Sequence, residues 1–259
     1  MGIKAKTYLG QHFLHDQGTL NVMVKAGEIK PADTIVEIGA GNGVLTKALL
    51  ATGANILAYE IDKDCFATLR ELAENHPQLT VIERSILDST APEGEYKVIA
   101  NIPYYLTGTI LRLFMHVFDH QPERMILLVQ KEVAQKITAT DSSILSLAVQ
   151  IYGEAKIIRQ VSKGAFNPPP QVDSAVIQII AHPKPILEVS STDFFKLARA
   201  CYHNQRKQIQ VSLRNVVNLS RDQVIDMLQT LQIDPTLRPE KLSLSQWQAL
   251  VKQFQPYMT

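Results

Sequence analysis

The stretch that decides the fold is TIVEIGAGNGVLTKALL, residues 34–50. Its first five residues are mostly apolar and indicate a short buried strand at 34–38, whereas the apolar residues of 44–50 have helical spacing. The segment between them, GAGNG at 39–43, has glycine at alternate positions. Glycines let the backbone pass close to a ligand, and a helix N-terminus offers free N–H groups. The stretch therefore predicts a strand, a ligand-binding loop and a helix.

Strands and helices continue to alternate after this stretch. We expect strands at 55–59, 79–83, 97–100 and 125–129, and helices ending near 72, at 106–117 and around 133–137. Residues 145–152, 155–161 and 175–180 fit later helices and strands of the same sheet. Alternation at this spacing predicts an α/β fold, with a parallel sheet covered by helices on both faces.

A stiff polar break, His182-Pro183-Lys184-Pro185, is the best candidate for a domain boundary. Beyond it the apolar pattern is helical at 194–201, 208–217, 221–231 and 244–254. A chain of 259 residues is long enough for a main domain with an appendage. We therefore expect an α/β domain at 1–183 and a small helical domain at 184–259.

The composition, 46% hydrophobic and 20% charged, is that of a globular protein. The two cysteines, Cys65 and Cys201, lie far apart and imply no disulfide framework, so a reducing, cytosolic setting is the default. No apolar run approaches the roughly 18 residues of a membrane span, and the histidines show no metal-ligand spacing. We expect no membrane segment and no metal.

The net charge of +1 leaves the nature of any charged partner open. Six basic residues nevertheless gather near the C-terminal side of the predicted boundary, with Asp193 as the single acidic residue among them: Lys196, Arg199, Arg206, Lys207, Arg214 and Arg221. Such a cluster fits a nucleic-acid-binding surface and equally a solvated helix face.

The glycine loop does not match the dinucleotide fingerprint. That fingerprint needs a glycine three residues after the second one, at position 44, which is a valine here. The spacing suits a ligand without a pyrophosphate. Glu60 ends the next predicted strand, where a carboxylate can accept hydrogen bonds from both hydroxyls of a ribose. Together, Gly39, Gly41 and Glu60 indicate an adenosyl nucleoside, with a tight turn as the alternative for the glycines alone.

The segment Asn101-Ile102-Pro103-Tyr104 follows the fourth predicted strand, at the sheet edge where α/β folds bind ligands. The exocyclic N6 amine of adenine is a poor nucleophile because its lone pair is delocalised into the ring. The Asn101 side-chain oxygen and a nearby backbone carbonyl can accept both amine hydrogens and so direct the lone pair. Pro103 has no N–H to compete, and Tyr104 can stack on a base lifted out of its helix. The alternative is a proline turn capped by a core tyrosine.

Six motifs together resemble the ribosomal RNA adenine dimethyltransferase family, most closely its small-subunit members, over nearly the whole chain. They are LGQHFL at 9–14, VEIGAGNG at 36–43, EID at 60–62, NIPY at 101–104, QKEV at 130–133 and FNPPPQVDSAV at 166–176. The resemblance implies a Rossmann-like, S-adenosylmethionine-dependent methyltransferase domain followed by a helical RNA-binding domain. It also implies dimethylation of two adjacent adenines in the 3′-terminal hairpin of small-subunit rRNA. The expected partner is the immature 30S subunit, and the expected state is a cytoplasmic monomer active in ribosome biogenesis.

The resemblance also assigns site residues. Those implied to bind the cofactor are Gln11, His12, Leu14, Gly39, Gly41, Glu60, Ser85 and Asn101. Those implied to act in catalysis are Asn101, Pro103 and Tyr104, and those implied to contact RNA are Phe166, Pro168, Arg206 and Lys207.

The chain departs from the family pattern at three places. The family usually has Asn at position 12, Gly-Asp at 84–85 and Arg-Arg-Lys-x-x-Arg-Asn at 205–211, where this chain has His12, Arg84-Ser85 and two glutamines in place of arginines. Serine is a shorter, uncharged acceptor for the cofactor adenine, so we expect weaker cofactor binding. Each lost arginine removes a possible phosphate contact.

Two other functions fit part of the pattern. A large-subunit rRNA adenine methyltransferase of the macrolide-resistance type shares the glycine loop and the Asn-x-Pro-Tyr segment. The triple proline at 168–170, the following 172–176 and the Arg206-Lys207 pair favour a small-subunit enzyme instead. A ribosome assembly factor with weakened catalysis would account for Ser85 and the missing arginines.

Overall fold

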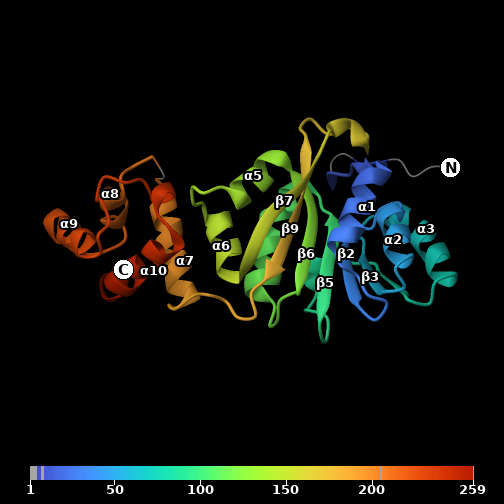
Figure 1. Ribbon diagram of the computed structural model, residues 1–259, viewed down its shortest axis with the longest axis horizontal. Coiled ribbons are helices and arrows are strands. Elements are labelled where there is room, and N and C mark those ends of the chain that lie inside the picture. Colours follow the sequence, from blue (N-terminus) through green and yellow to red (C-terminus); the bar gives the residue numbers. More distant parts are fainter. Residues whose placement is uncertain (1–4, 7–8, 205, 259) are drawn as a thin grey trace. The chain divides into compact units, whose positions relative to one another are not determined.

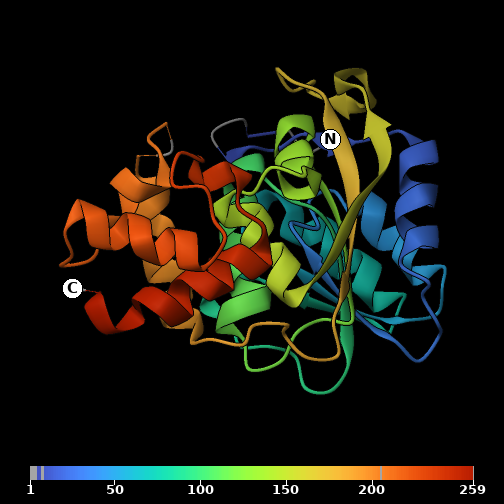
Figure 2. The same cartoon turned by 60° about the vertical axis from the view of Figure 1, so that its left-hand side comes forward.

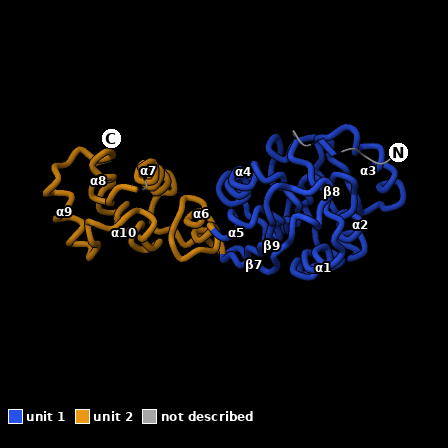
Figure 3. The backbone as a smooth tube through the Cα atoms, turned by 90° about the horizontal axis from the view of Figure 1, so that it is seen from above, with its two compact units in different colours: residues 1–135, 154–181 blue, residues 136–153, 182–259 orange. Residues whose placement is uncertain are grey.

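The computed structural model describes residues 5–6, 9–204 and 206–258. The chain forms two compact units, coloured separately in Figure 3. Unit 1 comprises residues 1–135 and 154–181, and unit 2 comprises residues 136–153 and 182–259. Residues 136–153 thus group with the helical unit, whereas the division expected from the sequence placed them in the first domain. The reason is packing: α6 (Ile144–Tyr152) contacts α7 (Ser191–Tyr202) and α10 (Leu244–Phe254).

Unit 1 is built on a seven-stranded sheet with the order β4-β3-β2-β5-β6-β9-β7 (Figure 1). Five neighbouring strands are parallel: β2 (Thr34–Ile38), β3 (Asn55–Tyr59), β4 (Leu79–Ile82), β5 (Tyr96–Asn101) and β6 (Arg124–Gln130). The expectation of a wholly parallel sheet is wrong at one side, because β9 (Ser174–Ala181) runs antiparallel to β6. It follows β7 (Gly153–Val161) without a helical crossover, and such a crossover is what returns a chain for a parallel strand.

The helices of unit 1 follow the strands as expected, with one addition. The helices are α1 (Gln17–Ala26), α2 (Val44–Leu50), α3 (Lys63–Glu74), α4 (Thr107–Arg112) and α5 (Lys131–Thr138), of which residues 136–138 are grouped with unit 2. Helix α2 has the predicted bounds, and α4 continues as a π-helical turn at Leu113–Val117. Helix α1 was not predicted, although Asp16 caps it by accepting a hydrogen bond from the Thr19 N–H.

A second, two-stranded sheet joins distant parts of unit 1. β1 (Phe13–Leu14) pairs antiparallel with β8 (Phe166–Asn167). In Figure 2 the olive segment that contains β8 lies beside the blue N-terminal segment. Strands of two residues carry no readable periodicity, so this pairing was not predicted. It brings the predicted LGQHFL and FNPPP motifs together.

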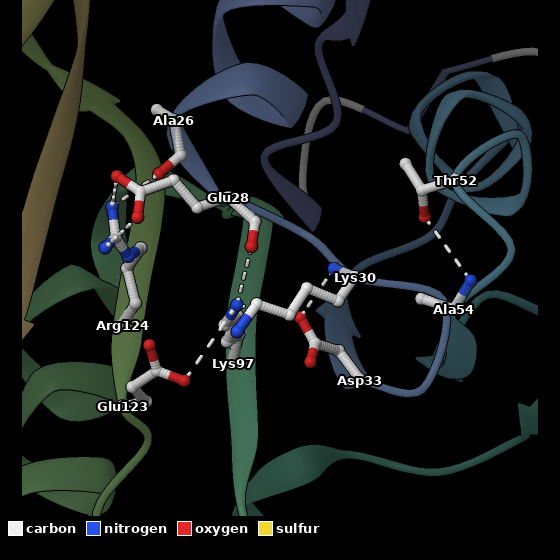
Figure 4. A network of polar contacts seen from close by, with 9 residues as sticks. All are labelled: Ala26, Glu28, Lys30, Asp33, Thr52, Ala54, Lys97, Glu123 and Arg124. Carbon is white, nitrogen blue, oxygen red and sulfur yellow. Dashed lines mark hydrogen bonds and ion pairs between the residues drawn. The ribbon is translucent and has the colours of Figure 1, made fainter.

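A network of ion pairs and hydrogen bonds around two buried cations closes the amino ends of β5 and β6 (Figure 4). Lys97, which is 4% exposed, donates to the Glu28 carbonyl at 2.8 Å and to the Asp33 carboxylate at 2.7 Å. Arg124 pairs with both carboxylate oxygens of Glu28 at 2.8 Å and donates to the Ala26 carbonyl at 2.9 Å. Buried charges are tolerated when they are paired and hydrogen-bonded in this way. The network fixes the end of α1 to the sheet, at the opposite end of β5 from Asn101.

Unit 2 is helical, as expected for the C-terminal region. Besides α6, α7 and α10 it contains α8 (Ile209–Leu213) and α9 (Arg221–Thr230). Helix α8 is shorter than the predicted 208–217, because the chain leaves the helix and Val217 forms an isolated bridge with Met258. Trp247 is fully buried and its ring stacks on Tyr202 with centroids 5.6 Å apart. In the described part of the chain, no helix combines the length and the apolar character needed to cross a membrane.

Candidate active site

A pocket in unit 1 lies at the carboxyl ends of β2, β3 and β5. The structure brings ten predicted site residues into its lining: Gln11, His12, Leu14, Gly39, Gly41, Glu60, Ser85, Asn101, Pro103 and Tyr104. They come from the N-terminal segment, the glycine loop and the loops that follow three strands. Ligands bind at this edge in open α/β sheets.

The glycine loop needs glycine for both conformation and space. Gly39, Gly41 and Gly43 have φ values of +72°, +57° and +78°, in the left-handed region that favours glycine. A Cβ at Gly41 would lie 3.0 Å from the Phe13 ring. The backbone can therefore line the pocket without side chains, as a closely held ligand requires.

Glu60 is a buried carboxylate, 5% exposed, directly after β3. One oxygen accepts a hydrogen bond from the Gly41 N–H at 2.7 Å. The other accepts from the N–H groups of Ile61 and Asp62, each at 2.7 Å. These three donors fix the carboxylate in the pocket wall, where its remaining lone pairs can accept hydrogen bonds from hydroxyl groups of a ligand.

Glu37 also lines the pocket, from β2 behind the glycine loop. It is 1% exposed, and its Oε2 atom has no hydrogen-bond partner among the residues that the structure describes. The pKa of this carboxyl group is raised to about 8, mainly by burial and also by the negative charge of Glu60, and hydrogen bonding from Thr46 partly offsets the rise. Glu37 was not predicted as a site residue. The signal that could have found it is a charge inside an otherwise apolar strand.

The Glu37→Gln variant should lose a pH dependence of stability. The pKa of Glu37 rises from an ordinary value of 4.5 to about 8 in the folded protein. Between these values the folded state holds a proton that the unfolded chain releases, so the free energy of unfolding falls as pH rises from about 5 to 8. Glutamine cannot ionise. Over this pH range the melting temperature of the variant should therefore fall less than that of the unmodified protein, by about 3 °C or more.

The measurement is thermal unfolding of the protein and of Glu37→Gln across this pH range. Glu93→Gln, at an exposed position, is the matched control and should behave like the unmodified protein. Parallel curves for the protein and Glu37→Gln would contradict the protonated state of Glu37.

Asn101 ends β5 with its carboxamide half-buried at the pocket. Its Nδ2 group donates to the backbone carbonyl of His12 at 3.1 Å. This bond sets the orientation of the carboxamide and leaves Oδ1 as its acceptor. Among the described residues, Oδ1 has no hydrogen-bond donor of its own. An acceptor is what a substrate amine requires.

Tyr104 presents a fixed aromatic ring in the same pocket. Its hydroxyl group is hydrogen-bonded to Ser174 Oγ at 2.7 Å, and its ring stacks on His12 with centroids 5.9 Å apart and planes 19° apart. Burial raises the pKa of the Tyr104 phenol, so the ring is neutral at physiological pH. A neutral, immobilised ring suits stacking on a base.

Gln11 holds the N-terminal segment to the start of α3. Its Nε2 group donates to Asp62 Oδ2 at 2.7 Å, and its Oε1 atom accepts from the Lys6 N–H at 2.8 Å. Lys6 Nζ also lies 2.5 Å from Asp62 Oδ1. Both ends of the Gln11 amide are thus engaged within the protein. Its contact with a cofactor stays a prediction, while Asp62 and Lys6 are supporting residues that the sequence reading missed.

Ser85 caps a short turn at the pocket rim. Its Oγ atom accepts from the Leu87 N–H at 3.1 Å, at the start of the 3-10 turn Ile86–Asp88. This bond uses one lone pair of Oγ, so the hydroxyl keeps its own hydrogen and a second lone pair for a ligand.

The predicted RNA contacts fall into two groups. Phe166 is 3% exposed and belongs to the core of unit 1, and the Pro168 carbonyl lies 2.8 Å from the His12 ring. Arg206 and Lys207 are exposed in the connection between α7 and α8, in unit 2. The contact of these four residues with RNA stays a prediction.

Comparison with known proteins gives a consistent picture. The family model described as ribosomal RNA adenine dimethylase matches residues 2–256. A ribosomal RNA small subunit methyltransferase A from Dehalococcoides mccartyi strain BAV1 is 40% identical over 261 residues, covering 97% of this chain and 89% of the relative.

Two solved structures share the fold. A dimethyladenosine transferase from Plasmodium falciparum matches with a TM-score of 0.81 at 24% identity, over 95% of this chain and 98% of that one. The 23S rRNA methyltransferase ErmE matches with a TM-score of 0.75 at 25% identity, over 94% of this chain and 99% of that one. The expected Rossmann-like methyltransferase fold with a helical C-terminal part is confirmed.

Proposed function

Because the chain belongs to the ribosomal RNA adenine dimethylase family, and is thereby an rRNA adenine dimethyltransferase, we propose that it acts on two adjacent adenines in the 3′-terminal hairpin of small-subunit rRNA. The methyl donor in this proposal is S-adenosylmethionine, and the substrate particle is the immature 30S subunit in the cytoplasm, bound by a monomer. The small-subunit relative at 40% identity favours this over the large-subunit alternative. The observation that carries the chemistry is the Asn101 carboxamide, oriented at the tip of β5 with Oδ1 as its acceptor.

The residues of the pocket fit S-adenosylmethionine. Glu60 offers a fixed carboxylate for the ribose hydroxyls, and the glycine loop allows close approach of the backbone. Ser85 offers a hydroxyl for the adenine edge. The buried Glu37 also lines the pocket, and among the described residues its Oε2 atom has no hydrogen-bond partner, so this carboxyl group is available for a hydrogen bond to the ligand. When bound, the cofactor supplies an electrophilic methyl group on a sulfonium sulfur.

Orientation of the acceptor amine is the contribution of the 101–104 segment. Asn101 Oδ1 accepts one hydrogen of the adenine N6 amine. The carbonyls of Pro103 and Tyr104 already accept hydrogen bonds from the Leu106 N–H and the Thr107 hydroxyl, so we assign the second hydrogen to the Ile102 carbonyl. With both hydrogens held, the nitrogen lone pair is left facing the methyl donor. Positioning of this kind accounts for much of the rate of group transfer.

Recognition of the RNA backbone is assigned to unit 2. All six basic residues of the sequence cluster, from Lys196 to Arg221, are exposed there. Lysine and arginine bind phosphate groups and release counterions, so binding through them weakens with salt. All six residues thus meet the condition of exposure that RNA binding requires, and a salt dependence of binding would distinguish this role from an inert solvated face.

The Ser85→Asp variant should bind S-adenosylmethionine about tenfold more tightly. A carboxylate accepts the hydrogens of the adenine exocyclic amine more strongly than a hydroxyl does, since hydrogen bonds to charged groups are worth about 1.5–3 kcal/mol. Aspartate can also keep the cap on the Leu87 N–H. Equilibrium cofactor binding measures the effect, with Thr90→Asp, which adds a carboxylate at an exposed position, as the control. An unchanged dissociation constant would show that Ser85 does not contact the cofactor.

The function itself is tested by methyl transfer from labelled S-adenosylmethionine, read at single-nucleotide resolution. The substrates are small-subunit particles that lack the modification and, in parallel, isolated large-subunit rRNA. We expect label on two adjacent adenines of the small-subunit hairpin. Label on large-subunit rRNA alone would contradict the proposal, and RNA binding without any label would favour the assembly-factor alternative.

A further inference from the structure

His12 lies where the N-terminal segment meets the walls of the pocket. The register of β1 and β8, continued by one residue, brings His12 opposite Pro168. Hydrogen-bonded and non-bonded positions alternate along an antiparallel pair, and His15 N–H donates to the Ala165 carbonyl at 3.0 Å. Position 15 is therefore hydrogen-bonded, position 14 non-bonded and position 13 hydrogen-bonded, which makes His12 a non-bonded position. Its backbone groups therefore face away from β8 and need other partners.

The backbone and the side chain of His12 take different partners. The backbone carbonyl accepts the Asn101 Nδ2 hydrogen bond at 3.1 Å. The imidazole Nδ1 lies 2.8 Å from the Pro168 carbonyl oxygen. A carbonyl can only accept, so Nδ1 must carry the hydrogen, and in the neutral ring Nε2 is then unprotonated. His12 thus holds the carboxamide of Asn101 through its backbone and the segment that follows β8 through its side chain.

The face of the His12 ring is also engaged. It stacks on the Tyr104 ring, with centroids 5.9 Å apart and planes 19° apart. Tyr104 is in turn anchored through its hydroxyl to Ser174, a fully buried residue of β9. The phenol ring is therefore held at its hydroxyl by the sheet and on one face by the imidazole.

We propose that His12 is a positioning residue for the RNA substrate, which fixes Asn101, Tyr104 and the Pro168 carbonyl before the target adenine enters. This inference rests on the proposed function. It places the imidazole on the substrate side of the pocket, whereas the family resemblance placed position 12 with the cofactor. A preorganised pocket avoids the cost of ordering these groups during binding.

Three variants separate the two contacts of the imidazole. His12→Phe keeps a planar ring against Tyr104 but has no donor for Pro168, and His12→Asn keeps a donor but has no ring. His12→Ala loses both. We expect kcat/KM for the RNA to fall about tenfold in each of the first two, the size of one hydrogen bond or one ring contact, and about a hundredfold in His12→Ala. The dissociation constant for S-adenosylmethionine should change less than about twofold.

His15→Asn is the matched control, because His15 is exposed three residues away, and it should leave both quantities unchanged. The proposal would be overturned if His12→Ala raised the dissociation constant of the cofactor about tenfold or more and lowered kcat/KM for RNA only by the same factor. A fall in kcat/KM for RNA with an unchanged dissociation constant for the cofactor would exclude a purely structural role, because general loosening of the fold would weaken cofactor and RNA binding together.

A second measurement does not depend on activity. Nitrogen-15 NMR of the protein above about pH 8 should show His12 as the Nδ1–H tautomer, with the signal lost in His12→Phe. An Nε2–H tautomer would overturn the assignment of the bond to Pro168. If the unmodified protein methylates neither RNA, the proposed function fails, and this spectrum still decides whether His12 holds the pocket as described.

Discussion

Replacing Asn101 with alanine should lower the rate of methyl transfer by about a thousandfold at saturating cofactor, with RNA binding nearly unchanged. The carboxamide is fixed by the His12 carbonyl at 3.1 Å, so its oxygen can orient the amine without a search for the right geometry. Alanine removes this acceptor, and the amine can then present an N–H group to the methyl donor instead of its lone pair. The loss should therefore appear in the chemical step.

Single-turnover transfer with labelled cofactor measures this step, and titration of the RNA measures binding. Asn75→Ala removes an exposed carboxamide at the end of α3 and serves as the matched control. Residual activity above about a tenth of the original would contradict the role assigned to Asn101. A loss of activity that is reversed by higher cofactor concentrations would also contradict it.

Replacing Glu60 with glutamine should weaken cofactor binding by about a hundredfold. The carboxylate faces three backbone N–H donors, from Gly41, Ile61 and Asp62. A glutamine amide has one acceptor atom, so its NH₂ group must face one or two of these donors and cannot accept a hydrogen bond from a ribose hydroxyl. Two weakened hydrogen bonds to a charged group, at about 1.5 kcal/mol each, correspond to about a hundredfold in the dissociation constant.

Equilibrium binding of both S-adenosylmethionine and its demethylated product tests this prediction. The two ligands share the ribose and differ at sulfur, so Glu60→Gln should weaken both equally. Glu71→Gln, at an exposed site on α3, is the control. A loss confined to the sulfonium form would place Glu60 at the sulfur and contradict its assignment to the ribose.

The local parts of the site could be predicted because each rests on a short pattern. The glycine loop needs only neighbouring residues to define it, and α2 has the predicted bounds, Val44–Leu50. The same holds for Asn101, which directly follows an apolar run. A strand tip and its loop are read from a few consecutive residues.

The parts that could not be predicted depend on residues far apart in the sequence. The pairing of β1 with β8 spans more than half the chain, and the contact of His12 with Pro168 follows from it. The antiparallel entry of β9 and the packing of α6 with α7 are also long-range. The burial of Glu37 is visible only once the sheet is covered. Composition and periodicity hold no information on such contacts.

The central claim is that the Asn101 carboxamide holds the acceptor amine toward the methyl donor. A crystal structure of the protein with a bisubstrate ligand, in which adenine N6 is joined by a short chain to the methionine end of the cofactor, tests it most directly. We predict Asn101 Oδ1 at about 3 Å from the linked nitrogen, with the adenine ring against Tyr104. A carboxamide turned into the core, or beyond hydrogen-bond reach of that nitrogen, would contradict the account.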